Sequence, residues 1–363
     1  GDTPTEKPLI TDSSLTSNDR TTSESSTIIA KDKKGNQVVV PGGFKISGDS
    51  GESVHQGIVI EDKDGNQVVW VPVSNKNGDG SNKIVKDDGS EVEITLGRYT
   101  FDGAYNPTTQ KVEGTGKATL IQKGSEYDQT TLAQATAGTL NTKYGVAKSS
   151  YYFYELNNSR TSNEKKDLTG TNTTAKNLQD FIEKTAVNKG FYIARKEASY
   201  GSGYNSSGTD TATKFGNAKP LSKVSTAKSA ISMNYNNSGT LWNFITQPQA
   251  ALVSQNMYKN DKYVESDLIN SYAWDTEIVY IQAMGNDNYA NQTDGNGTLK
   301  NTGSTGDEKC NIFDIAGNTG DWTTEYSTST DSSDAFPCTS RGGYCSGSRD
   351  YTSYRYCKDA TRS

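Results

Sequence analysis

Two cysteines near the C-terminus are the residues of this sequence best able to do chemistry. Cys345 and Cys357 lie in the stretch SRGGYCSGSRDYTSYRYC, residues 340–357, directly after an Arg-Gly-Gly turn. Thiolates bind soft metal ions and take part in redox reactions, whereas paired thiols form structural disulfides. The stretch is therefore either a redox or metal site or a binding surface shaped by a disulfide.

The number and placement of the cysteines favour disulfides. The four cysteines are confined to the last fifth of the 363 residues, at Cys310, Cys338, Cys345 and Cys357. An even count is typical of exported proteins, and it leaves three connectivities open. We expect Cys345 and Cys357 to form disulfides, either with each other or with Cys338 and Cys310.

The single histidine excludes several kinds of catalytic site. A Ser-His-Asp triad, a Cys-His pair or a zinc site with imidazole ligands would have to use His55, which has no motif around it in ESVHQG. We therefore interpret His55 as a surface loop residue.

The composition predicts a loop-rich protein with a modest core. Only 31% of the residues are hydrophobic, against about 45–50% in typical globular domains, and 35 residues are glycine. The net charge is −6 and the basic residues are scattered, so no basic stripe favours nucleic acid. No run reaches the ~18 apolar residues of a membrane span. The sequence starts at Gly1 rather than Met, so we expect that a leader or anchor has been removed.

The order of segments predicts a tail followed by one domain. Residues 1–28 are rich in Ser, Thr, Asp and Glu and are interpreted as a flexible tail or stalk, and 29–363 as a single domain. The element Gly-Asn-Gln-Val-Val occurs in 31–43 and again in 61–73, each time as a turn followed by a strand. Residues 74–186 are interpreted as an insertion, in which alternation over 91–101 predicts a strand with one buried face and about 102–172 is expected to be poorly regular.

Periodicity predicts three helices in the remainder of the chain. They fall in residues 173–185, 246–257 and 273–284, and GFYIARKEA at 190–198 is predicted to be a core strand. Thr246 and Gln249 fit a capping box.

Two motifs near the C-terminus resemble the formylglycine-generating enzyme family, also called sulfatase-modifying factors. CNIFDIAGNTGDW at 310–322 is similar to the family's N-x-x-G-L-Y-D-M-x-G-N-V-W-E-W, and SRGGYCSGS with SYRYCKDATRS is similar to its closing R-G-G-S-W and R-Y-R segments. VVWVPV, GFYIARKEAS and YAWDTEIVYIQ match further family motifs in sequence order. The resemblance covers 31–73 and 187–363.

The resemblance implies an α+β, irregular and loop-rich fold of the C-type-lectin type with a long insertion. The same fold without catalytic cysteines occurs in surface proteins of bacteria and phages and in variable proteins of diversity-generating retroelements. The sequence ends at Ser363, before the Gly-Phe-Arg strand with which the family closes. That central strand is then either missing from this sequence or supplied by another chain.

The family's copper site does not carry over. Its two copper(I)-binding cysteines correspond by position to Gly347 and Ser353, so both thiols are absent. We therefore expect no copper and no oxidase activity. A copper site built from Cys345 and Cys357 would be a different site from that of the family.

Calcium ligands of the family are better preserved. The resemblance places one calcium ion at Gly317, Thr319 and Asp321 in AGNTGDW, where Asp replaces the family's Glu. A second ion is implied at Asn291 with Asp294 or Asp307. Asx turns alone would explain the same residues.

The closing segment has the composition of a recognition surface. Residues 340–363 contain four Tyr, five Ser, four Arg and three Gly, and no large aliphatic residue. Tyr and Arg supply contact area while Ser and Gly adapt to a ligand. The turn Arg341, Gly342 and Gly343 is expected to support the ligand contacts, which we predict at Tyr344, Arg349, Tyr351, Tyr354 and Tyr356.

These observations predict a non-enzymatic recognition or surface-display protein, outside the cell or on a cell or virion surface. It would act as an adhesin, a receptor-binding protein or the head of a pilus-like filament. Its partner would be a protein or glycan on another surface, or like subunits in an assembly. The alternatives are a copper-dependent oxidase of the formylglycine type and a structural subunit of a filament or surface layer.

Overall fold

The computed structural model describes most of the chain in separate ranges. They are 27–74, 83–127, 134–136, 152–155, 178–223, 239–243, 245–294, 297, 299–328, 337–343, 345 and 351–359. In 134–136, 152–155, 326–328, 337–338 and 356–359 the description is limited to the backbone.

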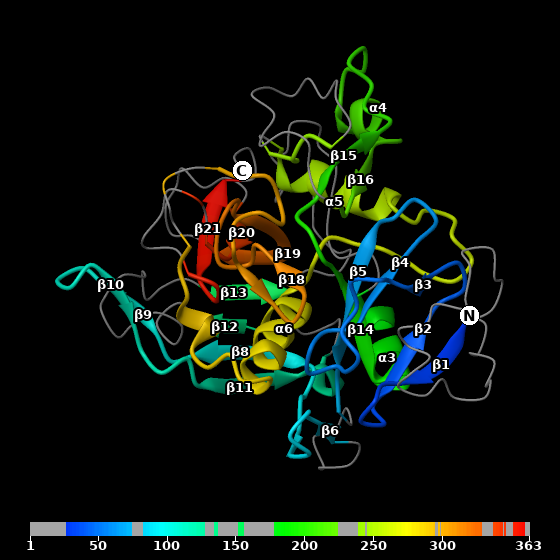
Figure 1. The fold of residues 1–363 in the computed structure, drawn as a ribbon. Helices are drawn as coiled ribbons and strands as arrows, with labels where there is room; N and C mark the ends of the chain where they lie inside the picture. Colours follow the sequence, from blue (N-terminus) through cyan, green and yellow to red (C-terminus); the bar gives the residue numbers. More distant parts are fainter. Residues whose placement is uncertain are drawn as a thin grey trace.

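Two antiparallel sheets form the framework of these residues (Figure 1). The smaller one has the order β14-β5-β4-β3, with β14 at Gly190–Ala194, β5 at Gln67–Pro72, β4 at Val59–Glu61 and β3 at Lys45–Ile46. The larger one has the order β12-β13-β19-β20-β21, with β12 at Gln134–Thr136, β13 at Tyr152–Glu155, β19 at Asp321–Thr328, β20 at Pro337–Arg341 and β21 at Arg355–Asp359. The predicted core strand at GFYIARKEA is confirmed as β14.

The other described strands pair as short two-stranded ribbons. They are β1 (Ile28–Lys31) with β2 (Gln37–Val40), β6 (Ile84–Val85) with β7 (Glu91–Val92), β8 (Gly97–Phe101) with β11 (Ala118–Lys123), β9 (Ala104–Asn106) with β10 (Lys111–Glu113), β15 (Ser199–Ser202) with β16 (Lys219–Leu221), and β17 (Glu308–Lys309) with β18 (Ile312–Phe313). The helices are α3 (Leu178–Asn188), α4 (Thr211–Phe215), α5 (Gln247–Asn256) and α6 (Ser271–Ala283), with 3-10 turns η1 (Gly124–Glu126) and η3 (Tyr289–Asn291). The loop-rich architecture predicted from composition is confirmed, and the mixture of helices with small antiparallel sheets agrees with the α+β class that the resemblance implies.

Helices α5 and α6 begin where their capping residues predict. At α5 the hydroxyl of Thr246 accepts from the Gln249 amide, and the Gln249 side chain accepts from the Thr246 amide, which completes the predicted capping box. At α6 the Asn270 side chain accepts from the amide of Ala273. The helix predicted over 273–284 is thus confirmed, with a start two residues earlier.

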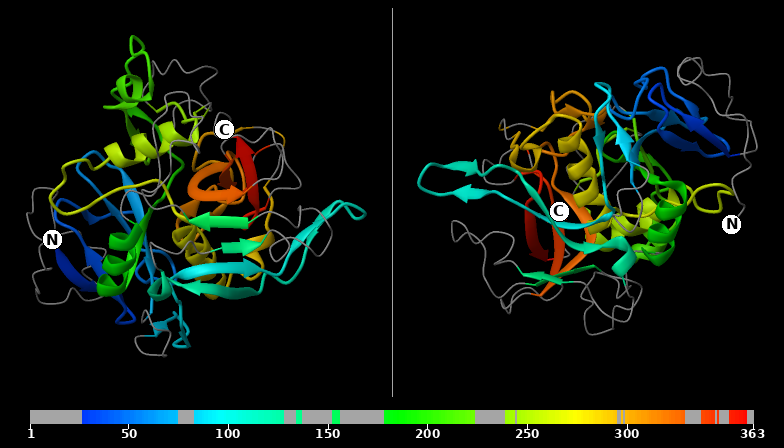
Figure 2. Two further views of the ribbon diagram at one scale, coloured as in Figure 1. Left: turned by 180° about the vertical axis from the view of Figure 1, so that it is seen from behind. Right: turned by 90° about the horizontal axis from the view of Figure 1, so that it is seen from below.

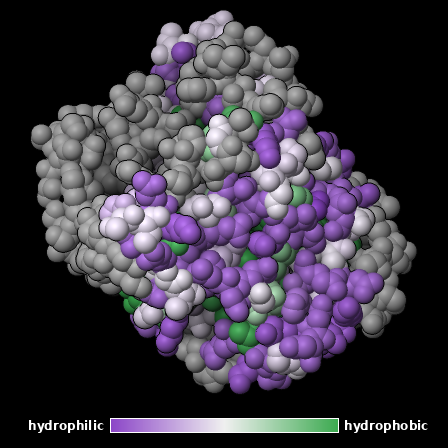
Figure 3. Space-filling view, turned by 60° about the vertical axis from the view of Figure 1, so that its left-hand side comes forward, coloured by the Kyte–Doolittle hydropathy of each residue, from purple (hydrophilic) through white to green (hydrophobic). Residues whose placement is uncertain are grey.

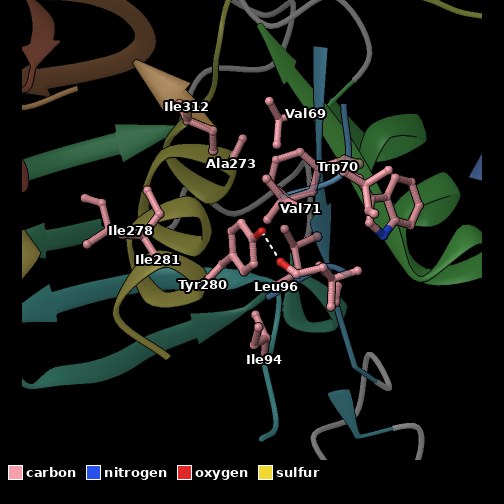
Figure 4. Close-up of a cluster of buried hydrophobic side chains, with 14 of the residues drawn as sticks. Val69, Trp70, Val71, Ile94, Leu96, Ala273, Ile278, Tyr280, Ile281 and Ile312 are labelled. Carbon is pink, nitrogen blue, oxygen red and sulfur yellow. Dashed lines mark hydrogen bonds between the residues drawn. The ribbon is translucent and has the colours of Figure 1, made fainter. Parts of the chain in front are cut away.

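Helix α6 lies between the two sheets and carries the centre of the core (Figure 4). Tyr280 and Ile281 of α6 belong to one core cluster with Val69 and Val71 of β5, and all four are 0% exposed. The Tyr280 hydroxyl donates to the Val54 carbonyl at 2.5 Å, so this buried phenol is satisfied. Trp274 is also buried, as expected of a core anchor.

The repeated Gly-Asn-Gln-Val-Val element forms two hairpins with the same internal hydrogen bonds. In each, an Asp accepts the amide and the side-chain nitrogen of the Asn four residues on, Asp32 with Asn36 and Asp62 with Asn66. These buried Asx turns connect β1 to β2 and β4 to β5. The prediction of a turn followed by a strand in each copy is confirmed.

Part of the segment interpreted as an insertion belongs to the core. Ile94 and Leu96 are at most 4% exposed, and β8 packs directly on α6. The amide of Tyr99 donates to the carboxylate of Asp275 on that helix at 2.9 Å. The buried face predicted for 91–101 is therefore confirmed, because its alternating apolar side chains fill the space beside α6.

The ribbon of β9 and β10 projects from the body of the protein (Figure 2). The face shown in Figure 3 is mainly hydrophilic, with only scattered hydrophobic residues. Within the described ranges the one exposed large hydrophobic side chain is Val187, and none of the helices there combines the length and apolar character of a membrane span.

Candidate functional site

A cluster of five charged side chains anchors the closing segment. Each is at most 4% exposed, and they come from five different elements: Arg98 of β8, Asp275 of α6, Glu325 of β19, Arg341 of β20 and Arg355 of β21. Glu325 accepts from Arg98 at 2.7 Å and from Arg355 at 2.9 Å. Asp275 accepts from Arg341 at 2.7 Å and from Arg355 at 2.6 Å. We call these five residues the arginine cluster.

The arginine cluster holds the Glu325 carboxylate in its charged form. Burial alone would raise the pKa of Glu325, but the positive charges of Arg355, Arg98 and Arg341 lower that pKa to about 2. The buried charges are therefore paired and hydrogen-bonded, which is the condition for tolerating them in an apolar interior.

Both ends of the segment 342–354 are tied to this cluster. Arg341, which precedes the segment, donates to the carbonyls of Ser353 and Tyr354 at its far end, at 3.1 Å each. The indole of Trp274 donates to the Thr352 carbonyl at 3.0 Å. The segment therefore leaves and re-enters the fold at fixed points.

The Arg-Gly-Gly turn, predicted to support the ligand contacts, lies directly on the core. Gly342 has φ of +80°, and an added Cβ would lie 2.6 Å from the Ile315 carbonyl oxygen and 3.0 Å from the Trp274 ring. Only glycine combines this left-handed conformation with such a close approach. The turn thus joins the closing segment to the loop that precedes β19.

The predicted ligand contacts divide into three groups. Tyr351 is 2% exposed, so its assignment as an exposed contact is wrong, because its ring packs in the interior with that of Tyr354 at a centroid distance of 5.2 Å. Tyr354 is half-buried. Tyr356 pairs with Ser340 through the backbone of β21. Tyr344 and Arg349 lie outside the described residues.

The positions equivalent to the family's copper cysteines are partly described. Ser353 is 8% exposed, and its hydroxyl and amide both donate to the Ala290 carbonyl, each at 2.9 Å. This hydroxyl fixes the end of the segment to η3. Gly347 lies outside the described residues.

Two of the four cysteines, Cys310 and Cys345, are free thiols in the structure, and the disulfides stay a prediction. The thiol of Cys310 donates to the His55 carbonyl at 3.8 Å. Burial raises the pKa of this thiol to about 12. Cys345 is half-buried, and its backbone is bonded to Asn318 and Gly297. The two cysteines are engaged with different loops and so are not joined. The side chains of Cys338 and Cys357 lie outside the described part of the chain. The backbone of Cys357 is described, and it pairs with that of Thr339.

His55, interpreted as a surface loop residue, lies in a turn and is half-buried. Its Nδ1 accepts a hydrogen bond from the amide of Asp87 at 3.1 Å.

The loop from 307 to 320 is shaped by left-handed residues and buried acids. Cys310, Asn311, Asp314 and Asn318 all have φ between +49° and +68°. Asp314 accepts from the hydroxyls of Thr302 and Thr305 and from the amide of Gly303, at 2.6 to 3.0 Å. These side-chain bonds replace regular secondary structure in the loop.

The first predicted calcium position lies in this loop. Thr319 donates through both its amide and its hydroxyl to Glu197, so this carboxylate lies against the turn. Gly317 leaves no room for a side chain, since an added Cβ would lie 2.7 Å from Cβ of Asp294. Burial and then the charge of Asp314 raise the pKa of Asp321 well above its ordinary value. The loop therefore gathers carboxylates next to the predicted ligands.

The second predicted position has one atom without a partner. Asn291 is 6% exposed, and its Oδ1 makes no hydrogen bond, while its amide nitrogen donates to the Asp102 carbonyl. Asp307 accepts from the Tyr289 hydroxyl and from the Ala316 amide. Burial raises the pKa of Asp307 to about 6. The Asp294 carboxylate has one buried oxygen without a partner.

Sequence reasoning missed three buried carboxylates around this loop. Glu197 follows β14, Asp314 lies within the loop, and Glu277 lies on α6. In the described ranges no three Asp, Glu, His or Cys side chains are grouped closely enough to form a metal site by themselves. The sequence did contain a signal for a buried carboxylate, namely an acidic residue inside the largely apolar helix sequence YAWDTEIVYI. Acids in such positions are buried and have shifted pKa values.

No protein-family model, curated protein or solved structure was found to match the chain.

Proposed function

We propose that the chain is a non-enzymatic recognition or surface-display module, outside the cell or on a cell or virion surface. It would bind a protein or glycan, or like subunits, through the segment between Arg341 and Arg355. We further propose that its fold is of the C-type-lectin type found in the formylglycine-generating enzyme family. The motif order and the antiparallel, loop-rich architecture support this assignment.

The observation that carries the proposal is the anchoring of the closing segment at both ends. Arg341 and Arg355 enter one buried cluster, and Arg341 also binds carbonyls of Ser353 and Tyr354. Fixing both ends of a segment reduces the conformational entropy that it can lose on binding, which favours affinity. Its Tyr, Ser, Arg and Gly composition suits recognition of varied surfaces.

A glycan array and a whole-cell binding array test the proposal. We expect the full chain to bind a subset of targets, and the double variant Tyr344→Ala with Arg349→Ala to lose that binding without a change in thermal midpoint. Lys184→Ala on the exposed side of α3 is the matched control and should bind as the parent does. Binding retained by the double variant would overturn the assignment of the segment.

A copper titration tests the non-enzymatic part of the proposal. The buried hydroxyl of Ser353 takes the place of one copper thiol, while Cys345 is a free, half-buried thiol. We expect no stoichiometric binding of copper(I) by the reduced protein. Tight binding that is lost in Cys345→Ser would establish the oxidase alternative instead.

We also propose that calcium orders the loop beneath the segment, with Asp321 and the carbonyls of Gly317 and Thr319 as one ligand set. Calcium prefers hard oxygen ligands on flexible turns. The concentration of buried carboxylates fits this ion, as does the unpartnered Oδ1 of Asn291 at the second position with Asp307. Bound calcium would neutralise negative charge and fix the loop on which the Arg-Gly-Gly turn rests.

A further inference from the structure

Glu277 is a buried carboxylate without any hydrogen-bond partner. It lies on α6 with 0% exposure, and both Oε1 and Oε2 are unpaired. A carboxylate in this state is among the most unfavourable groups to bury, and native structures explain such groups by a bound ion, a bound water or a proton. Glu277 therefore requires an occupant that the protein atoms do not provide.

The neighbours of Glu277 add negative charge. Burial contributes most to raising the pKa of Glu277, followed by the negative charges of Asp321 and Asp307, while Arg341 acts in the opposite direction. Arg341 is already bonded to Asp275 at 2.7 Å and to the Ser353 carbonyl at 3.1 Å, so it does not serve as a partner. The site thus has an excess of negative charge.

Asp321 is a half-buried acid whose charge acts on the same site. It begins β19, which packs on α6, and its pKa is raised by burial and by Asp314, with no described donor or cation to offset them. By contrast, Asp307 is bonded to Tyr289 and to the amide of Ala316, and Glu197 is bonded to Asn318 and Thr319. Of the two acids whose charges act on Glu277, Asp321 and Asp307, Asp321 is therefore the one whose carboxylate accepts from no described donor.

We propose that Glu277 and Asp321 together bind one calcium ion, as carboxylate ligands from α6 and from the start of β19. The proposal rests on the calcium site proposed above and adds to it a ligand from a helix. Because no third acidic side chain joins them, carbonyls of the 317–320 turn and water complete the oxygen shell. A water molecule alone would leave both charges uncompensated.

The proposed ion has a structural consequence for the recognition segment. Asp275 of the arginine cluster is two positions from Glu277 on α6, and Asp321 is paired with Arg341 across β19 and β20. An ion between Glu277 and Asp321 would therefore link the loop before β19 to the helix that anchors the segment. Calcium is then expected to rigidify the segment without contacting its ligand.

Calcium titration by calorimetry on the EDTA-treated full chain tests the proposal, together with thermal unfolding in EDTA and in calcium. We expect one site that Glu277→Gln and Asp321→Asn each weaken by about tenfold or more. Glu277→Gln should raise the thermal midpoint in EDTA, because it removes a buried ionisable group, and lower it in calcium. Glu183→Gln on α3 is the exposed control and should change neither quantity.

Three outcomes distinguish this proposal from the ones on which it depends. Calcium binding lost in Asp321→Asn but unchanged in Glu277→Gln would overturn the role of Glu277 and leave the calcium site in place. A parent protein that binds no calcium would overturn both, while the array results would still decide recognition. If Glu277→Gln does not fold, Glu277→Asp replaces it, because this variant keeps the charge. A calcium affinity of Glu277→Asp equal to that of the parent would refute a ligand role at this position.

Discussion

Replacing Glu325 by Gln should disrupt the arginine cluster at its centre. Glu325 receives hydrogen bonds from Arg98, Arg355 and Arg341 at 2.7, 2.9 and 3.4 Å. The amide keeps the shape of the side chain but not its charge, so three buried guanidinium groups would remain with Asp275 as their one carboxylate. Removing one partner from a buried ion pair costs about 3–5 kcal/mol.

The pKa of Glu325 gives an independent magnitude. Its ordinary value of 4.5 is lowered to about 2 in the folded protein. At 1.36 kcal/mol per pKa unit this corresponds to about 3 kcal/mol of folding stability. Because the folded pKa is depressed, this contribution is complete above pH 4.5 and is lost as pH falls towards 2. The cost of breaking the buried ion pair and the lowered pKa of Glu325 therefore give a similar loss of folding stability.

Urea unfolding of the full chain at pH 7 and pH 3, followed by tryptophan fluorescence, measures this effect. We expect the free energy of unfolding of Glu325→Gln to be about 3–5 kcal/mol below that of the parent at pH 7. The difference should narrow by about 2 kcal/mol at pH 3, since the parent carboxylate is then partly protonated in the unfolded state. Glu183→Gln on α3 should stay within about 0.5 kcal/mol at both pH values. A difference below about 1 kcal/mol at pH 7, or one independent of pH, would refute the reasoning.

Two further predictions concern the turn and the thiols. Gly342→Ala should lower the thermal midpoint by the equivalent of more than about 1 kcal/mol, because its Cβ would lie 2.6 Å from the Ile315 carbonyl oxygen. Gly48→Ala, where a Cβ meets nothing within 4 Å, is the control, and equal shifts would contradict the prediction. In the native protein iodoacetamide should label Cys345 and spare Cys310, whose thiol has a pKa of about 12. Peptide mass mapping checks this, and native labelling of Cys310 to the same extent as Cys345 would contradict the raised pKa of its thiol.

Local signals in the sequence predicted the parts of the fold that depend on local chemistry. The capping box of Thr246 and Gln249 fixes the start of α5, and the Asp and Asn of each repeated hairpin form their turn within five residues. The Arg341-Gly342 turn was likewise identified from its residue types. In the capping box and the hairpins the decisive bonds join residues close in sequence, so a short sequence motif predicts them, whereas the contacts of the Arg341-Gly342 turn join distant segments.

Contacts between distant segments were not predictable in this way. Arg98 lies in the strand predicted over 91–101, but nothing in that stretch indicates its partner Glu325, which is 227 positions away. Tyr351 belongs to a stretch without large aliphatic residues, which indicated exposure, yet its ring is buried with that of Tyr354. Polar and aromatic residues become core residues when a distant partner satisfies them, and composition does not reveal that partner.

The two acids of α6 show how one helix serves both buried charge clusters. Asp275 is neutralised within the protein by Arg341 and Arg355, whereas Glu277, two positions later, has no protein partner. The sequence provides arginine partners for Asp275 and none for Glu277, so a ligand or a proton has to compensate the charge of Glu277. Since Asp321 is also unsatisfied and lies in the strand that pairs with Arg341, an occupant shared by Glu277 and Asp321 would act on the same anchor that holds the closing segment. The stability of the arginine cluster and the occupancy of the Glu277 site are therefore expected to be coupled, so that calcium should raise the urea midpoint of the parent more than that of Glu325→Gln.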